Sequence, residues 1–186
     1  MWLTNDINII KSMHDVFGLK QSVFSILSIF SFSILSTILL LYIGWDFLSE
    51  LALWKTIVAM VIVLDINAGL IANFTKGTND FYQNEPKKRW IFISIHFHVL
   101  IVAWLFEVES YSAVVISWVA TISVASMLNI LKSSAWSSMQ RIVAAVCLGL
   151  GLILIMVLNW SNLVLQIVAM LFYIKVAYSF SVNHYE

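Results

Sequence analysis

The sequence of 186 residues predicts an all-α fold: a polytopic membrane protein built as a bundle of six transmembrane helices. Hydrophobic residues make up 61% of the chain and charged residues 11%, whereas a soluble domain has about 45–50% and about 25%. A soluble domain of this length could not bury so much apolar surface. The apolar residues also form continuous stretches rather than the short alternating segments of a transmembrane β-barrel, which predicts helices.

Six stretches are long enough to cross a bilayer, for which a helix needs about 20 mostly apolar residues. The loops between them are short and leave no room for a soluble domain. We therefore predict one transmembrane domain over residues 23–186, with helices at about 23–43, 52–73, 90–106, 111–131, 142–159 and 161–180.

Residues 1–22 are too polar to cross a membrane. Their apolar side chains Leu3, Ile7, Ile10 and Phe17 follow helical spacing, which predicts an amphipathic helix lying on the membrane surface. The alternative for this segment is a mobile tail.

Charge and cysteine content exclude several classes of protein. Lys and Arg number 10, as do Asp and Glu, so the formal net charge is zero. Domains that bind nucleic acid carry a basic excess, so we expect no nucleic-acid partner. The single cysteine, Cys147, excludes an internal disulfide and a cysteine-based metal cluster.

The distribution of Lys and Arg predicts the orientation, because cytoplasmic loops carry the excess of these residues. If the N-terminus is cytoplasmic, eight of them lie on or near the cytoplasmic side, and Lys55 stands alone on the other. We therefore expect the cell (inner) membrane, with both termini in the cytoplasm and the lipid bilayer as a partner. The eight are Lys11, Lys20, Lys76, Lys87, Lys88, Arg89, Lys132 and Arg141.

Four ionisable residues stand out within the predicted spans: Asp65, His96, His98 and Lys175. A rise of about 1.5 Å per residue places them about 8–12 Å from the cytoplasmic ends of three helices. Ionisable groups are costly in a membrane and often mark functional sites. We therefore predict that Asp65, His96 and His98 are catalytic and that Lys175 helps to bind a substrate.

The neighbours of Asp65 on its helix suggest its direction. Ala68, Gly69 and Ala72 lie three, four and seven residues further on, and small residues bring helices together in membranes. We expect Asp65 to point into the bundle. Lys175 either extends toward the interface or pairs with Asp65, because a buried charge needs a partner.

The two histidines are two residues apart, so they project about 200° from each other around a helix. At most one of His96 and His98 is expected to face Asp65, and the sequence does not say which. These three residues are also the candidates for a divalent metal ion, a cofactor that the sequence leaves open. Zinc would require three protein ligands at one point.

Further polar residues continue from Asp65 toward the cytoplasmic end of the predicted helix. We predict that Asn73, Asn79 and Tyr82 line the mouth of a pocket and bind a substrate. Asn129, at the cytoplasmic end of the fourth predicted span, would extend the same site. The alternative is a solvated connector without a binding role.

The segment from Asp65 to Asn73 resembles the start of the CDP-alcohol phosphotransferase signature, Asp-x-x-Asp-Gly-x-x-Ala-Arg. The resemblance implies a six-spanning fold with a site facing the cytoplasm. Here, however, Ala68 replaces the second Asp and Asn73 replaces the Arg, and the downstream acidic residues are missing. A two-metal site needs several carboxylates and this chain offers one, so we do not assign it to that family.

Three functions fit these observations. The first is a membrane-embedded enzyme or binding protein acting on a lipid or other amphiphile by Asp/His acid–base or metal chemistry. The second is a small-solute or proton-coupled transporter, or its membrane component. The third is a non-catalytic assembly subunit of a homo- or hetero-oligomer. Few glycines and no proline lie within the spans, which predicts unbroken helices and argues mildly against alternating access.

Overall fold

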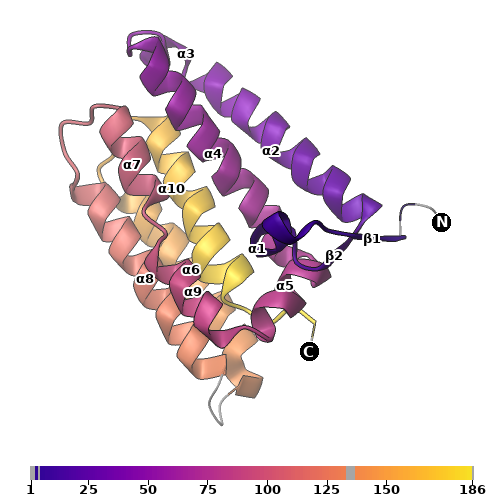
Figure 1. Cartoon of the computed structure of the whole chain (residues 1–186). Coiled ribbons are helices and arrows are strands. Elements are labelled where there is room, and N and C mark those ends of the chain that lie inside the picture. Colours follow the sequence, from indigo (N-terminus) through magenta and orange to yellow (C-terminus); the bar gives the residue numbers. More distant parts are fainter. Residues whose placement is uncertain (1–2, 4, 133–136, 186) are drawn as a thin grey trace.

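The computed structural model describes residues 3, 5–132 and 137–185. These residues form a bundle of helices (Figure 1), of which six are long and apolar enough to cross a membrane. They are Val23–Ile43 (α2), Leu53–Phe74 (α4), Pro86–Leu105, Ser112–Lys132 (α8), Ser137–Val157 and Leu163–Phe180. The prediction of an all-α fold with six such helices is confirmed, and its boundaries differ by at most five residues.

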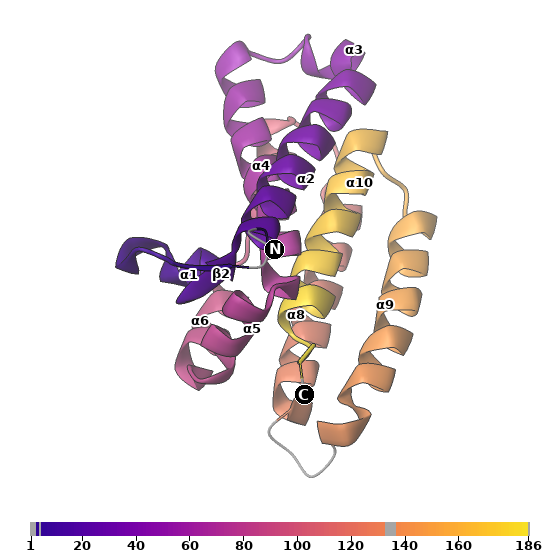
Figure 2. The ribbon, with the colours of Figure 1, turned by 90° about the vertical axis from the view of Figure 1, so that its right-hand side faces the viewer.

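The last of these helices lies at the centre of the bundle. In its most apolar window 61% of the residues are buried, against 17% for both Val23–Ile43 and Ser137–Val157. Figure 2 shows α10 (Leu163–Tyr173) between the α2–α4 pair on one side and α9 (Gln140–Val157) on the other. Residues carried by the last helix are therefore surrounded by protein, whereas α2 and α9 are peripheral.

The third span is broken, which contradicts the prediction of unbroken helices. It consists of α6 (Pro86–Ser94) and α7 (His98–Leu105), and residues 95–97 between them do not continue either helix. Side-chain nitrogens pair the carbonyls that lose their helical bonds: His96 Nδ1 contacts the carbonyl of Phe92, and Trp118 Nε1 donates to the carbonyl of His96 at 2.9 Å. A break at this depth is tolerated because neighbouring groups pair the freed backbone.

The sixth span is also irregular, because α10 continues into a π-helix, η4 (Ile174–Phe180). The wider turn leaves carbonyl groups that side chains then pair. Ser179 Oγ and Asn73 Nδ2 donate to the carbonyl of Lys175 at 2.9 and 3.4 Å, and Ser181 Oγ donates to that of Val176 at 2.7 Å. Single π-turns within helices are frequent at functional sites.

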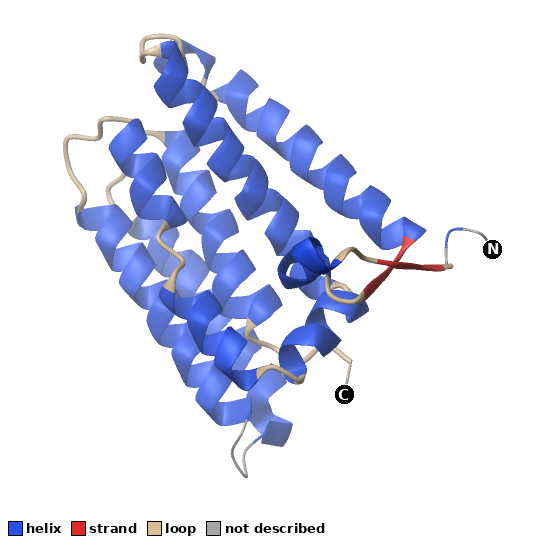
Figure 3. Cartoon of the chain, viewed as in Figure 1, coloured by secondary structure: helices blue, strands red, loops and turns tan. Residues whose placement is uncertain are grey.

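The N-terminal segment is not the amphipathic helix predicted for residues 1–22. Its described residues form an antiparallel hairpin of β1 (Asp6–Asn8) and β2 (Lys20–Ser22). Between the strands lie η2 (Lys11–Met13) and α1 (His14–Phe17), as Figure 3 shows. The helix stops at Gly18, whose φ of 71° turns the chain back; this left-handed conformation favours glycine. Helical spacing of the apolar residues did not reveal that turn.

Short helices connect the spans at both ends of the bundle. At one end α3 (Trp45–Leu48) follows α2. At the other end the polar stretch after α4 folds into α5 (Lys76–Gln83), and η3 (Ser137–Met139) precedes α9. Both chain termini lie near the end that carries α5 (Figure 1).

Candidate functional site

Lys175 carries a buried charge within the sixth span. It is the second residue of η4 and is 3% exposed. Its Nζ donates to Asp65 Oδ2 at 2.8 Å and to the backbone carbonyl of Asp65 at 3.3 Å. The structure therefore favours the paired alternative for Lys175 over extension to the interface.

Gly69 makes room for the stem of Lys175. A Cβ atom at position 69 would lie 2.4 Å from Lys175 Cε and 2.8 Å from Nζ. Because Gly69 is one helical turn beyond Asp65 on α4, the same face supplies both the carboxylate and the space for its partner. Gly69, one of the small residues near Asp65, thus leaves space for the side chain of Lys175 to reach from η4 to Asp65 on α4.

Asp65 lies at the rim of the bundle rather than in its interior. Its Oδ2 faces Lys175, yet its side chain is 54% exposed. Its neighbours Val61 and Leu64 are exposed apolar residues, at 60% and 37%. We expected Asp65 to point into the bundle. Its carboxylate instead lies at the outer surface, where it contacts the buried ammonium of Lys175 on one side and is surrounded by exposed apolar residues on the other.

His98 is the histidine that faces Asp65. It is the first residue of α7, and its Nε2 lies 3.6 Å from Asp65 Oδ2. Its Nδ1 is buried and has no hydrogen-bond partner among the described residues. The break in the third span thus places an imidazole, with one nitrogen unsatisfied, beside the Asp65–Lys175 pair.

His96 has a different environment. It is 4% exposed, packs against the ring of Phe92 with centroids 3.8 Å apart, and contacts the Phe92 carbonyl through Nδ1. Its ring lies edge-on to that of His98 at 5.1 Å. The ring of His96 therefore packs against the ring of His98. Of the two histidines between which the sequence could not choose, His98 is the one that lies beside Asp65.

The arrangement does not fit a metal ion. Among the described residues, no group of three or more His, Cys, Asp or Glu side chains could hold one. Of the three candidates, Asp65 Oδ2 already accepts from the ammonium of Lys175, and His96 Nδ1 is directed at a carbonyl. A cation at Asp65 would meet the like charge of Lys175, so we derive no chemistry through a metal.

The predicted binding residues Asn73 and Asn79 hold the C-terminal part of the chain. Asn73 Nδ2 donates to the carbonyl of Lys175 at 3.4 Å, and Asn79 Nδ2 donates to that of Val182 at 3.1 Å. Both side chains are 4% exposed. Asn73 therefore belongs to the support of Lys175, and Asn79 lies away from Asp65.

Tyr82 and Asn129 also make bonds within the protein. The hydroxyl of Tyr82 donates to the backbone carbonyl of Asp15 at 2.7 Å, and Asn129 Oδ1 accepts from Arg89 Nε at 2.6 Å. Burial raises the pKa of the Tyr82 phenol, and the charge of Asp15 adds to this effect. The structure brings neither residue to the Asp65–Lys175 pair.

Arg89 and Gln140 join several elements at the end of the bundle that carries α5, and neither was predicted as a site residue. Arg89 is 3% exposed and donates through Nη2 to the carbonyl of Ser181 at 3.1 Å. Gln140 donates to the carbonyls of Leu128 and Ser181, both at 3.0 Å. Arg89 ends a run of three basic residues, a pattern typical of a loop outside the membrane. The one signal in the sequence that Arg89 could be buried is its position directly before a predicted span.

Comparison with models of known protein families, with curated proteins and with solved structures finds no match to this chain. The functional argument therefore depends on the chemistry of the described residues.

Proposed function

We propose that the six apolar helices cross a cell membrane, the inner one where there are two, with both termini in the cytoplasm. The basic residues support this orientation, because eight of the ten lie at or near the end of the bundle that carries both termini. Lys55, near the start of α4, lies toward the opposite end and pairs there with Glu107. Asp65 is then about 14 Å from the end of α4, at about 1.5 Å per residue, within the apolar layer of the membrane.

We propose that the protein is a proton-coupled transporter or its membrane component, and that Asp65, Lys175 and His98 form its proton-exchanging site. The observation that carries this proposal is the coincidence of the ion pair with two irregular spans. Lys175 lies in the π-helix of the sixth span, and His98 begins the helix after the break in the third. Ionisable groups at interrupted helices are typical of ion and proton pathways in transporters.

The chemistry follows from the charges of the pair. A proton added to Asp65 converts the carboxylate into a neutral acid and removes its attraction for the ammonium of Lys175. Because this contact joins η4 to α4, protonation would loosen the sixth span from the second. His98, 3.6 Å from Asp65 Oδ2, is placed to receive or return the proton after a small movement, since unliganded distances often shorten in working complexes.

Reconstituted vesicles test this function. We expect the wild-type protein to carry protons down an imposed gradient, measured with an enclosed pH-sensitive dye, either alone or on addition of a co-transported solute from a panel. Asp65→Asn keeps an oxygen that accepts from Lys175 but cannot carry a proton, so flux should fall to that of empty vesicles. Asp46→Asn, outside the spans, is the matched control. Equal flux for Asp65→Asn and wild type would refute the site.

A second candidate function, acid–base chemistry on a membrane lipid or other amphiphile, is favoured by the exposure of Asp65. Its side chain is 54% exposed beside apolar residues, so a molecule dissolved in the lipid could reach it from the side. Mass spectrometry of lipids incubated with the protein would reveal a product that Asp65→Asn does not form. If Asp65→Asn altered only stability, with neither flux nor product in the wild type, an assembly subunit would be the better description.

A further inference from the structure

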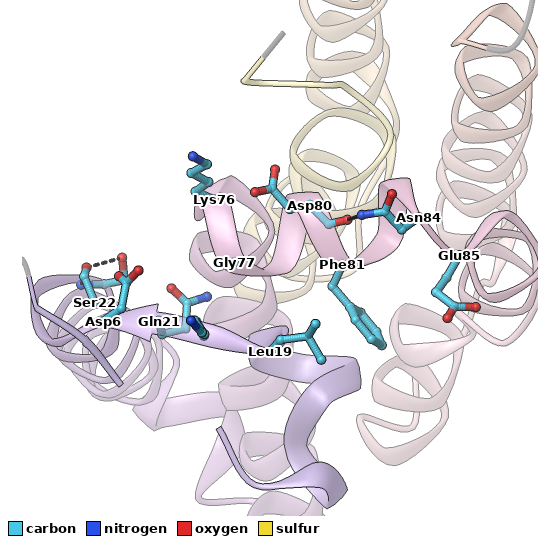
Figure 4. Close-up of a pocket in the computed structure, with 12 residues that line it drawn as sticks. Asp6, Leu19, Gln21, Ser22, Lys76, Gly77, Asp80, Phe81, Asn84 and Glu85 are labelled. Atoms are coloured by element: carbon cyan, nitrogen blue, oxygen red, sulfur yellow. Dashed lines mark hydrogen bonds between the residues drawn. The ribbon is translucent and has the colours of Figure 1, made fainter. Parts of the chain in front are cut away.

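A second polar site lies at the cytoplasmic end, away from Asp65. A half-open pocket of about 500 Å³ separates the N-terminal hairpin from α5, within the usual volume of ligand sites. Figure 4 shows Leu19 and Phe81 facing each other below α5, with Asp6 and Glu85 to either side of them and the side chains of Lys76 and Asp80 on the upper side of α5. The pocket therefore combines an apolar floor with a charged rim.

Two glycines bring the N-terminal hairpin into close contact with α5 beside the pocket. A Cβ atom at Gly18 would lie 2.0 Å from the carbonyl oxygen of Gly77, and one at Gly77 would lie 1.9 Å from that of Lys20. Only glycines allow the hairpin to approach α5 so closely. Gln21, 2% exposed, fixes the contact by donating through Nε2 to Thr75 Oγ1 at 2.5 Å. The two walls are thus formed before any ligand binds.

The charges around this pocket are opposite in sign but do not pair with each other. Two are cationic and three are anionic, from both walls, yet within the described chain no ion pair joins any two of them within the 4.0 Å limit. A charged rim without internal pairs is free to bind a ligand that carries both signs. The five residues are Lys20, Lys76, Asp6, Asp80 and Glu85.

The position of the pocket along the axis of the bundle indicates which part of the bilayer surrounds it. Ser22 and Ser25, at the start of α2, line it together with Lys76, which follows the end of α4. If the spans lie in a bilayer, as proposed above, this level is that of the lipid headgroups of the cytoplasmic leaflet. Lysines attract phosphates there, and the three carboxylates suit an amine.

We propose that this pocket binds a zwitterionic phosphoethanolamine group, with the phosphate at Lys20 and Lys76 and the primary ammonium at the carboxylates. A primary ammonium donates three hydrogen bonds, which carboxylates accept. A quaternary ammonium is instead recognised by several aromatic rings, and Phe81 is the one aromatic side chain lining this pocket. The ligand is therefore an ethanolamine phospholipid or, with the same chemistry, a soluble phosphoethanolamine ester.

Native mass spectrometry of the full chain in detergent tests this proposal. The probes are phosphatidylethanolamine, phosphatidylcholine with the same acyl chains, and soluble glycerophosphoethanolamine. We expect phosphatidylethanolamine to bind at least about tenfold more tightly than phosphatidylcholine, as for loss of charged hydrogen bonds. Asp80→Asn and Lys76→Gln should each remove that preference, whereas the controls Asp46→Asn and Lys87→Gln should keep it.

Each outcome decides between the possible sources of the ligand. Binding of the lipid but not of the soluble ester supports a headgroup site, whereas equal affinity for both supports the same chemistry with a soluble ligand. Equal binding of the two lipids, or full preference in both pocket variants, would overturn the proposal. Circular dichroism of each variant shows whether it is folded, and Glu85→Gln is the replacement for a variant that is not. Proton flux through Asp65 does not enter this test.

Discussion

The Asp65–Lys175 site (the core site) and the end of the bundle that carries α5 both contain buried polar residues, but these residues are bonded differently. At the α5 end, amide and guanidinium groups donate to backbone carbonyls: Asn79 to Val182, Arg89 and Gln140 to Ser181. At the core site, one half-exposed carboxylate serves both Lys175 and His98. The first region is held by several hydrogen bonds to backbone carbonyls, and the second depends on a single carboxylate.

This difference separates residues that hold the fold from residues that are available for chemistry. A fully bonded amide has no reason to change its partner, because leaving it unpaired is unfavourable. The Asp65–Lys175 pair can change its charge, and His98 retains an unsatisfied buried nitrogen. Substitutions in the two regions should therefore fail in different ways.

The largest effect is expected when the carboxylate is removed without an acceptor in its place. Asp65→Leu leaves the ammonium of Lys175, 3% exposed, without an ionic partner, and such losses destabilise by about 3–5 kcal/mol. Lys175→Met should also destabilise, because it leaves the Asp65 carboxylate without its partner beside exposed apolar residues in the proposed membrane layer. Unfolding in mixed micelles measures both. Equal stability of Asp65→Leu and wild type would show that the ion pair contributes nothing.

A smaller loss of stability is expected at the α5 end of the bundle, without any change in proton flux. Arg89→Leu removes charged hydrogen bonds to Asn129 and to the carbonyl of Ser181; we expect a net loss of about 1.5–3 kcal/mol, the range for a hydrogen bond to a charged group. Residues 181–185 should then exchange their amide hydrogens faster, as hydrogen–deuterium exchange would show. Lys87→Leu is the matched control. If a folded Arg89→Leu protein lost proton flux, Arg89 would have a role in function as well as in stability, which would contradict the difference proposed between the two regions.

Gly69→Ala tests how closely the side chain of Lys175 fits against α4, because it displaces Lys175 without altering its charge. The added methyl group would overlap the Lys175 stem, and overpacking of this kind destabilises by about 1–3 kcal/mol. At Gly149 nothing lies within 4 Å of the same added atom, so Gly149→Ala should be neutral or slightly stabilising. Thermal unfolding and proton flux of the two variants should differ; identical behaviour would mean that the fit around Lys175 is loose.

The sequence predicted the helices of this fold better than their interruptions. Apolar length identified all six spans, because crossing a bilayer imposes a composition that tertiary contacts do not change. The break at residues 95–97 and the π-helix of η4 were not predicted, since neither contains Gly or Pro. Both depend on distant side chains, such as Trp118 for the break, that pair the freed carbonyls.

The candidate site was predicted in part. Depth along each helix predicted that Asp65, Lys175 and a histidine share a layer, and they do. Depth did not predict which way a side chain turns, so it could not choose His98 over His96. Asn79 and Tyr82 were predicted to line the mouth of the same pocket because they continue the polar stretch after Asp65. Their partners are instead the C-terminal segment and the N-terminal hairpin, elements whose positions no local pattern encodes.

The smallest expected effect is a dependence on pH at the C-terminal segment. Burial lowers the pKa of His184 below its ordinary 6.5; the bond to the Ser179 carbonyl opposes this shift, and Arg141 adds to it. The unfolded chain then binds the proton first, so stability falls as the pH drops below about 6.5. The free energy of unfolding should decrease less on acidification in His184→Gln than in wild type. Parallel pH dependences would contradict this assignment.

Infrared difference spectroscopy of the protein in lipid, recorded as the pH is changed, tests the proton-exchanging site most directly, because it needs no substrate. If Asp65 takes up and releases a proton, the wild type will show a protonated-carboxyl band that is absent in Asp65→Asn, shifted in Lys175→Met, and unchanged in Asp46→Asn. If the spectrum of Asp65→Asn is the same as that of the wild type, the carboxylate does not exchange protons and serves only to hold Lys175 in place.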